Sequence, residues 1–394
     1  MFLPDYVLKA MEILKKNGFV GFAVGGCVRD ALLGKTPDDY DMTVSCFPEE
    51  TEKCFEDYRC IETGIKHGTV TVLVDGHMLE LTTFRRDGEY KDNRHPEGVT
   101  FTRDIRNDLS RRDFTVNAMA YSPDTGLIDL FGGRDDLKNG IIRCVGEPVK
   151  RFEEDALRIM RCVRFASALG FETEEATAAA AFNCSPLLKN ISAERIFTEL
   201  KKLLNGKAAK EVLLRYRKLL EAAVPELQAV SDAAYTAVSD KLAAVNGTES
   251  KLTLFLSPLG TQKADEALCG LKCDNRQRKL TSFLLENAQR EFASVGEVKR
   301  FAGEHGTQKL KTLLSYREAL GQTDDELLRN GINAAEEKNA CLKITDLALN
   351  GADVAAMGYK GKEIGETLSR LLLAVTEGKT ENEKEKLREY INTV

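Results

Sequence analysis

The sequence lacks any apolar run that approaches the roughly 20 residues needed to span a bilayer as a helix. Its first segment, MFLPDYVLKAMEILKKNGF, mixes acids and lysines within a helical period. It also lacks the basic start and the apolar block of a signal peptide. From these absences we expect a cytoplasmic protein that has no membrane partner.

Cysteine pairs with the spacing of metal sites are missing as well. Ten cysteines are present, but none stands in a CxxC pair, and the closest two, Cys269 and Cys273, have no histidine nearby. This spacing disfavours both a zinc site and a disulfide framework. Reduced and mostly buried thiols are therefore expected.

An excess of positive charge is also missing, because the formal net charge is −6. The chain is therefore not a basic nucleic-acid binder overall, and an RNA partner has to be held by local basic patches. The hydrophobic fraction of 43% and the charged fraction of 30% are typical of globular proteins.

The part before residue 147 mixes helical and β-rich runs. A helix is predicted over 4–17, strands over 20–24 and 39–46, and a hairpin over 68–84 with its turn at Asp75-Gly76. The polar segment 84–101 is either a long loop or a mobile lid. The segment 127–146 is expected to form two short strands around turn residues.

After residue 147 helical periodicity dominates. Single helices are predicted over 152–170, over 192–206 between a Ser192 cap and a Gly206 stop, and over 207–223. A chain of 394 residues is expected to hold about two to four domains. The predicted fold class is α+β: a mixed sheet with helices, followed by all-α modules.

The strongest chemical signal is a glycine turn followed by two aspartates. In GGCVRDALLG (25–34), Gly25 and Gly26 follow a short strand and Arg29 lies just inside a helix, an arrangement that can cradle phosphates. In DDYDMTV (38–44), Asp39 and Asp41 are predicted to lie on one face of a strand. Two such oxygen donors suit Mg²⁺ that is bound partly by nucleotide phosphates.

These two segments resemble the signature of the nucleotidyltransferase superfamily related to DNA polymerase β. More narrowly, the chain is similar to the family of class II tRNA nucleotidyltransferases (CCA-adding enzymes) and bacterial poly(A) polymerases. The resemblance continues through LELTTFRRDGEY, DLSRRDFTVNAMAY, RFEEDALRIMRCVRFASALGF, ISAERIFTELKKLL and the region 344–379. It thus spans nearly the whole chain and is weakest over 224–310.

The resemblance implies a polymerase-β-like catalytic head followed by helical modules. We expect a head (catalytic palm) at 1–146, a neck carrying a base template at 147–206, a body at 207–310 and a tRNA-binding tail at 311–394.

In the head, the resemblance implies that Asp39 and Asp41 hold two Mg²⁺ ions against the α-phosphate of CTP or ATP. One ion lowers the pKa of the RNA 3′-hydroxyl, and the other stabilises the leaving pyrophosphate. Glu80 is the candidate for a third catalytic carboxylate, with an outward-facing strand residue as the alternative.

The segment SRRDFTVNA carries three further candidates for nucleotide binding. Arg112 is a candidate contact to phosphate or sugar, with a surface basic pair as the alternative. Asp113 resembles the family residue that accepts a hydrogen bond from the ribose 2′-hydroxyl, a role that suits a carboxylate. Asn117 is expected to support the same site.

The stretch RFEEDALRIMRCVRFA (151–166) has two readings. It is either a salt-bridged surface helix or a helix whose Asp155 and Arg158 share one face and bind a base. Asp155 only accepts hydrogen bonds and Arg158 only donates them, so the pair complements the Watson–Crick edges of C and A and mismatches those of U and G.

In the family, EDxxR is the protein template for CTP and ATP, which favours base binding at Asp155 and Arg158. Arg161 and Arg164 extend the row as nucleotide or phosphate contacts, or as a brace for Glu154 and Asp155.

Three activities share these motifs: complete CCA addition to tRNA, partial addition, and poly(A) addition. The segment RRDGEYKDNRHPEGV (85–99) resembles the flexible loop that CC-only enzymes lack. The acidic, short C-terminal segment differs from the basic extension of poly(A) polymerases. Complete CCA addition is therefore favoured over A-only addition, poly(A) synthesis or an inactive tRNA-binding relative. No His-Asp dipeptide occurs, so no phosphohydrolase activity is expected.

The RNA partner is expected to be tRNA, bound by shape along its acceptor and T stems. A basic stretch at 201–220 is a candidate phosphate contact, with a solvated helix face as the alternative. Its cations are Lys201, Lys202, Lys207, Lys210, Arg215, Arg217 and Lys218. NRQRK (275–279) is a second such patch, and no protein partner is implied.

Overall fold

The computed structural model describes residues 2–88, 98–322 and 324–393. The chain divides into two compact units, Met1–Gln228 and Ala229–Val394. Among the described residues, none of the helices has the length and apolarity that crossing a membrane requires.

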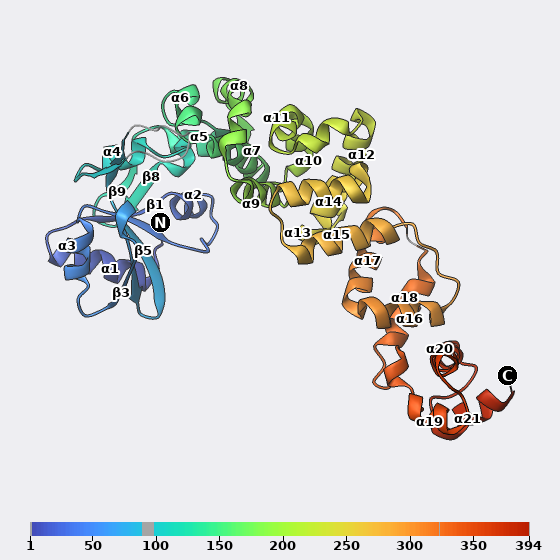
Figure 1. Ribbon diagram of the computed structural model, residues 1–394. Coiled ribbons are helices and arrows are strands. Elements are labelled where there is room, and N and C mark those ends of the chain that lie inside the picture. Colours follow the sequence, from blue (N-terminus) through green and yellow to red (C-terminus); the bar gives the residue numbers. More distant parts are fainter. Residues whose placement is uncertain (1, 89–97, 323, 394) are drawn as a thin grey trace. The chain divides into compact units, whose positions relative to one another are not determined.

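A seven-stranded mixed sheet forms the first part of the N-terminal unit, and the helices α7 to α11 follow it (Figure 1). Its strand order is β3-β4-β5-β2-β1-β8-β9. β2 and β5 pair in parallel, whereas the other neighbouring strands are antiparallel. The strands are β1 (Gly21–Val24), β2 (Asp41–Val44), β3 (Arg59–Gly64), β4 (Thr69–Val74), β5 (His77–Thr83), β8 (Met119–Ser122) and β9 (Gly126–Asp129).

The β4–β5 hairpin follows the predicted pattern. Val70, Val72 and Val74 are buried at alternate positions of β4, as one buried sheet face requires. Asp75 and Gly76 both have positive φ, 47° and 84°, which is the requirement of the tightest hairpin turns. The predicted hairpin is confirmed.

Three helices pack on the sheet. α1 (Asp5–Lys16) lies on β1 and β4, α2 (Gly26–Leu32) on β1 and β8, and α3 (Pro48–Cys54) on β4 and β5. α1 buries Val7, Ala10, Met11 and Leu14, which recur at the spacing of one helix face. The helix predicted over 4–17 is thus confirmed.

The segment predicted as a loop or lid, 84–101, begins and ends in strands. β6 (Arg85–Asp87) pairs antiparallel with β7 (Val99–Phe101). The loop interpretation is therefore wrong for these two ends. Positions 89–97, at its centre, lie outside the described residues.

The turn-rich stretch within 127–146 holds a helix that the sequence reading missed. After α4 (Ile105–Ser110), η2 (Thr115–Asn117) and β9 comes α5 (Gly133–Asn139), and then β10 (Ile141–Ile142), which pairs with β11 (Glu172–Thr173). Gly132 and Gly140, with φ of 76° and 67°, flank α5 at its two ends. The glycines that suggested a turn thus mark the ends of a short helix.

The single helix predicted over 152–170 is two helices. α6 (Pro148–Glu154) ends before Asp155, whose backbone is extended (φ −136°, ψ 101°), and α7 (Leu157–Leu169) follows. Asp155 Oδ1 accepts from the backbone N–H of Leu157 at 3.1 Å. Because this local bond competes with the helical backbone bonds, the helix breaks at the aspartate. α7 ends at Gly170 in the left-handed region, as predicted.

The N-terminal unit ends in further helices. α9 (Ala193–Leu204) confirms the helix predicted over 192–206, although the Ser192 side chain makes no cap bond. The helix predicted over 207–223 is divided at Tyr216 into α10 (Ala209–Arg215) and α11 (Arg217–Ala223). α8 (Glu175–Cys184) precedes them.

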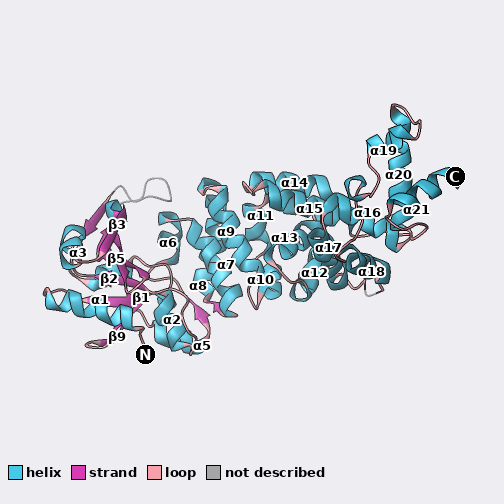
Figure 2. Ribbon diagram, turned by 90° about the horizontal axis from the view of Figure 1, so that it is seen from below, coloured by secondary structure: helices cyan, strands magenta, loops and turns pink. Residues whose placement is uncertain are grey.

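The described part of the C-terminal unit is helical and contains no strand (Figure 2). Its α-helices are α12 (Asp232–Lys241), α13 (Thr248–Leu256), α14 (Gly260–Gly270), α15 (Asn275–Asn287), α16 (Val295–His305), α17 (Thr307–Ala319), α18 (Glu326–Ala335), α19 (Gly351–Ala356), α20 (Lys362–Thr376) and α21 (Lys384–Thr393). The predicted α+β fold class is confirmed.

Candidate functional site

Two aspartates stand at one edge of the mixed sheet. Asp41 is the first residue of β2, whereas Asp39 precedes the strand, so the prediction that both lie on it is wrong. β1 runs antiparallel to β2, which brings Gly25, at the end of β1, to the same edge. Asp41 pairs with Glu80 across the parallel β2–β5 ladder. The sheet register therefore brings the predicted third carboxylate next to Asp41.

The charge environment of Asp41 is set by two neighbours. Desolvation raises the pKa of Asp41 although the residue is exposed, the charge of Arg112 lowers it, and that of Asp39 raises it. No cluster of three or more metal-ligating side chains occurs at the residues that the structure describes. Two neighbouring carboxylates fit a hard cation that takes its other ligands from a nucleotide and water.

The glycine turn brings the backbone close to an arginine. Gly25 has φ 79° and ψ −126°, and a Cβ there would lie 3.0 Å from Nη1 of Arg112. The positive φ favours glycine, and the arginine would have to shift slightly to make room for a Cβ. Arg29, in the last turn of α2, donates to Asp30 at 2.8 and 2.9 Å and to Asn117 Oδ1 at 2.7 Å. Arg29 and Asn117, predicted as binding residues, therefore touch each other.

Asp108 is a site residue that the sequence reading missed. Its side chain is fully buried and accepts hydrogen bonds from Arg111, from Arg112 and from Thr43. Burial opposes its ionisation, but the charges of Arg112 and Arg111 lower its pKa overall. The available signal was its spacing, since an acid three and four residues before two arginines faces both on a helix.

Asp113 is buried in a network of donors. Its Oδ2 accepts from Nε of Arg161 at 2.7 Å, and its Oδ1 accepts from Asn117 Nδ2 at 3.2 Å and from the Phe114 N–H at 2.8 Å. Burial opposes ionisation, yet Arg161 and the hydrogen bonds lower the pKa of Asp113 to about 2. The side chain is thus a carboxylate already held by protein donors.

Asp155 and Arg158 do not share one helix face, which corrects the prediction. Asp155 accepts from the Leu157 N–H and, through Oδ2, from Arg195 at 3.3 Å. Arg158 is 8% exposed and donates to Glu154 Oε2 at 2.7 Å and to the Arg111 carbonyl at 2.9 Å. The alternative, a salt-bridged surface helix, is correct about the ion pair of Arg158 with Glu154 but wrong about exposure, because Arg158 is buried.

The remaining arginines of α7 pair with acids outside their own helix. Arg161 contacts Asp113, and Arg164 Nε donates to Glu199 Oε2 at 2.8 Å. They pair with these acids rather than with Glu154 and Asp155, so the brace alternative is wrong. Burial lowers the pKa of Arg164, and the charge of Glu199 opposes that change.

Several of the seven cations predicted to contact RNA lie against acids or aromatic rings of the protein. Arg215 pairs with Glu172, Arg217 and Lys218 pair with Glu221, and Lys201 lies 4.5 Å from the Phe197 ring centroid. The exposed lysines of the stretch are Lys202, Lys207, Lys210 and Lys218. In the second patch, Arg278 pairs with Asp265 at 2.6 Å.

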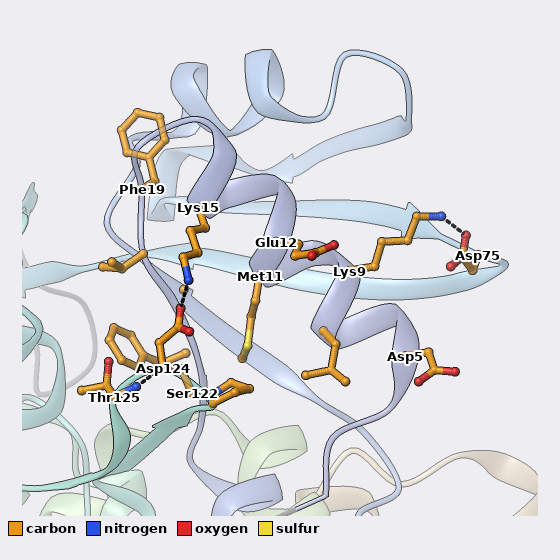
Figure 3. Close-up of a pocket in the computed structure, with 15 residues that line it drawn as sticks. Asp5, Lys9, Met11, Glu12, Lys15, Phe19, Asp75, Ser122, Asp124 and Thr125 are labelled. Atoms are coloured by element: carbon orange, nitrogen blue, oxygen red, sulfur yellow. Dashed lines mark hydrogen bonds and ion pairs between the residues drawn. The ribbon is translucent and has the colours of Figure 1, made fainter.

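A cavity of about 550 Å³ flanks α1, away from these residues (Figure 3). The ion pairs Lys9–Asp75 and Lys15–Asp124 stand at its rim, with N···O distances of 2.6 and 2.8 Å. Its lining contains none of the predicted catalytic or nucleotide-binding residues.

Three family models match successive parts of the chain. The poly(A) polymerase head domain matches residues 21–143, and an RNA- and SrmB-binding site of polymerase A matches 170–230. Domain 2 of tRNA nucleotidyltransferases matches 244–391.

Curated relatives match nearly the full length. The CCA-adding enzyme of Geobacillus stearothermophilus is 36% identical over 393 residues, which cover 98% of this chain and 95% of that protein. The CCA-adding enzyme of Streptococcus gordonii is also 36% identical, over 99% of this chain and 98% of that protein.

Among solved structures, the Bacillus stearothermophilus CCA-adding enzyme in complex with CTP matches with a TM-score of 0.82 and 33% identity over 99% of both chains. A Thermotoga maritima CCA-adding enzyme in complex with tRNA shares the fold, with a TM-score of 0.66 at 20% identity, over 99% of this chain and 96% of that chain. By its full-length similarity, this chain belongs to the CCA-adding enzymes, a family of nucleotidyltransferases.

Proposed function

We propose that this protein adds C, C and A to the 3′ end of tRNA from CTP and ATP. The observation that carries the proposal is the sheet edge where Asp39 and Asp41 stand beside the Gly25 turn and Arg112. In each cycle the RNA 3′-oxygen bonds to the α-phosphorus, the bond to the β-phosphate oxygen breaks, and pyrophosphate leaves. The proton of the 3′-hydroxyl passes to solvent water.

Asp39 and Asp41 hold Mg²⁺ in this proposal, with Glu80 as a further carboxylate. The pair fits the ion because each side chain, when ionised, offers only acceptor oxygens. When bound, the ions lower the pKa of the 3′-hydroxyl and stabilise the departing pyrophosphate.

Around the metal-binding carboxylates, Gly25 and Gly26 let the backbone approach phosphate oxygens, and Arg29 and Arg112 supply positive charge. The Nε–H of Arg112 is buried and has no hydrogen-bond partner. Such a donor is costly to leave unpaired, and a nucleotide oxygen offers it a partner.

Asp113 and Asn117 bind the ribose in this proposal. The Asp113 carboxylate accepts hydrogen bonds from the side chains of Arg161 and Asn117 and from the backbone N–H of Phe114. A ribose 2′-hydroxyl adds a donor at the same carboxylate, which favours ribonucleotides over deoxyribonucleotides. Arg161, which holds Oδ2, is then placed at the sugar, and Arg164 continues the row.

Base choice is assigned to Asp155 and Arg158. Asp155 accepts from the exocyclic amine of C or A, and Arg158 donates to the neighbouring ring nitrogen. U and G present the reverse pattern and leave buried groups unpaired, which costs about 1–3 kcal/mol per group. Because Asp155 has an extended backbone between two helices, its carboxylate is placed by the helix break rather than by a helix face.

In this proposal the chain has four functional parts: a catalytic head at 1–146, a neck at 147–206, a body at 207–310 and a tail at 311–394. The exposed Lys202, Lys207, Lys210 and Lys218 contact phosphates of the acceptor and T stems in this proposal. Arg215 is exposed as well, whereas Lys201 and Arg217 are half-buried and therefore less accessible to RNA.

The test supplies tRNAs that end at the discriminator base, at C and at CC. Each is incubated with CTP, ATP or both, and the products are sequenced. Stepwise completion to CCA is the expected result. Addition of A alone would assign an A-adding enzyme, and a long A tail on unrelated RNA would assign a poly(A) polymerase. Binding of tRNA without incorporation would assign an inactive relative.

A further inference from the structure

One aromatic ring in α7 is surrounded by three of the arginines assigned to the nucleotide. Phe165 is 5% exposed. The guanidinium carbon of Arg164 lies 3.5 Å from its ring centroid, and those of Arg29 and Arg161 each lie 5.3 Å away. Arg29 comes from α2 in the head, whereas the other two share α7 with the ring. The ring therefore joins cations from two separate segments.

A chain of hydrogen bonds connects Arg29 with Arg161, the two arginines that lie farther from the ring. Arg29 donates to Asn117 at 2.7 Å, and Asn117 donates to Asp113 at 3.2 Å. Arg161 donates to the other oxygen of Asp113 at 2.7 Å. Phe165 contacts Arg29 and Arg161, the two ends of this hydrogen-bonded chain. The chain and the aromatic side chain together therefore form a closed set of contacts.

Phe165 is itself held in place by a neighbouring aromatic residue. The ring of Phe114 meets it edge to face, with centroids 5.7 Å apart and an interplanar angle of 78°. Phe114 is fully buried and directly follows Asp113 in the chain. The orientation of Phe165 is thus tied to the segment that carries Asp113 and Asn117.

The three guanidinium groups around Phe165 carry the same charge and repel one another unless negative charge lies nearby. Asp30, Asp113 and Glu199 each pair with one of the three arginines. The negative face of an aromatic ring attracts guanidinium groups as well, more strongly when both are desolvated. The side chains of Arg29 and Arg164 are only 11% and 13% exposed, so this condition is met.

We propose that Phe165 is a positioning residue, whose ring face holds Arg29, Arg161 and Arg164 where they bind the sugar and triphosphate of the nucleotide. The proposal rests on the nucleotide-binding role given to these arginines above. Arg158, to which base selection is assigned, donates to Glu154 and to the carbonyls of Arg111 and Arg151. Phe165 therefore acts on nucleotide affinity and leaves the choice between bases unchanged.

The test changes the charge distribution of the ring with little change in its volume. Phe165 is replaced, by suppression of a stop codon, with phenylalanines that carry one, two and three ring fluorines, which progressively withdraw electron density from the face. Affinities for CTP and for ATP are measured by calorimetry. We expect the Kd of both nucleotides to rise stepwise with fluorination, by about fivefold to tenfold for three fluorines. The melting temperature and the CTP-to-ATP affinity ratio should stay constant.

A matched series at Phe84 provides the control. Phe84 is also buried, and it packs with Phe22, Val24, Leu109 and Ala120 in the core of the sheet. Fluorination there should leave the Kd of both nucleotides unchanged. Equal Kd values along the Phe165 series, or equal changes in the two series, would overturn the proposal.

The readout separates this proposal from the proposed function. Equilibrium binding is measured without turnover, so a protein that binds CTP and ATP but does not complete CCA still tests Phe165. In that case the function assignment fails while the fluorination series keeps its meaning. A parent protein that binds neither nucleotide overturns the positioning role as well.

Discussion

Asp41, the first residue of β2, lies directly opposite Glu80 in the parallel pairing of β2 with β5. Parallel register brings the two carboxylates to the same edge of the sheet, although they are 39 positions apart in the sequence. Replacement of Glu80 by Gln should therefore raise the Mg²⁺ concentration needed for half-maximal incorporation while the maximal rate changes less. Titration of Mg²⁺ at saturating CTP measures this. An unchanged Mg²⁺ requirement would remove Glu80 from the site.

Asp39→Asn and Asp41→Asn should have a much larger effect. Each removes one of the two carboxylates assigned to the metal, and we expect incorporation to fall by about a thousandfold or more. Binding of tRNA, measured by gel shift, should change little. Asp38→Asn is the matched control, because it removes an exposed neighbouring acid that has no assigned role. Activity that survives both substitutions contradicts the metal assignment.

The base template is tested with Arg158→Lys. Lysine keeps the charge but loses the planar fork that addresses a base edge. Misincorporation of U and G should rise about tenfold, the ratio that about 1.4 kcal/mol gives, with a smaller change in KM for CTP. Arg151→Lys is the control, since Arg151 also pairs with Glu154 but has no template role. Equal fidelity in the two variants would refute the assignment.

The pH dependence of stability follows from Asp113. Its pKa is lowered to about 2 in the folded chain, so its contribution to stability is complete above the unfolded pKa near 4. That contribution is lost as the pH falls through about 2. At pH 7 it amounts to about 2 kcal/mol. Asp113→Asn should lower the melting temperature of the N-terminal unit by about 4–8 °C at pH 7.

The same difference should shrink as the pH falls below about 4, because Asp113 in the unfolded wild-type chain then binds a proton, whereas in the folded chain it does so only near pH 2. Differential scanning fluorimetry of both proteins between pH 3 and pH 7 measures it. A difference that is constant over this range would show that charge on Asp113 does not stabilise the fold.

The sequence predicted the elements whose patterns are local. The β4–β5 hairpin followed from alternating valines and from Asp75-Gly76, and α1 from its apolar period. The break at Asp155 was missed, because a side-chain bond to the Leu157 N–H outweighs a helical pattern that runs through the residue on both sides. Local periodicity carries no information about such a competition.

Contacts within the site between residues far apart in the sequence could not be predicted from local patterns either. The glycine turn indicated Arg29, and motif resemblance indicated Asn117, Asp113 and Arg161, but their hydrogen-bonded chain depends on tertiary packing. From the sequence alone, Phe165 is only one of the apolar residues of α7. The role proposed for Phe165 depends on its contact with Arg29, which lies 136 positions earlier in the chain. No local sequence pattern connects the two residues.

Tyr6 contacts two aromatic rings next to the aspartates assigned to the metal. Its ring stacks on His77, with centroids 4.3 Å apart at 10°, and meets Tyr40 edge to face at 6.3 Å. Tyr40 is buried and stands between Asp39 and Asp41 in the sequence. Because Tyr40 is held from one side by this ring, a smaller side chain at position 6 lets the aspartates shift. Small displacements of catalytic groups cost large factors in rate.

Tyr6→Leu should therefore lower kcat by about tenfold and change KM for CTP little. Tyr6→Phe keeps the ring and should retain nearly full activity. This variant distinguishes the contribution of ring packing from that of the Tyr6 hydroxyl. Leu8→Ala is the control, because Leu8 lies on the same helix and its side chain is exposed. Steady-state kinetics of the three variants at saturating Mg²⁺ measure these effects. If Tyr6→Leu and Leu8→Ala behave alike, the loss comes from α1 as a whole and not from the contact with Tyr40.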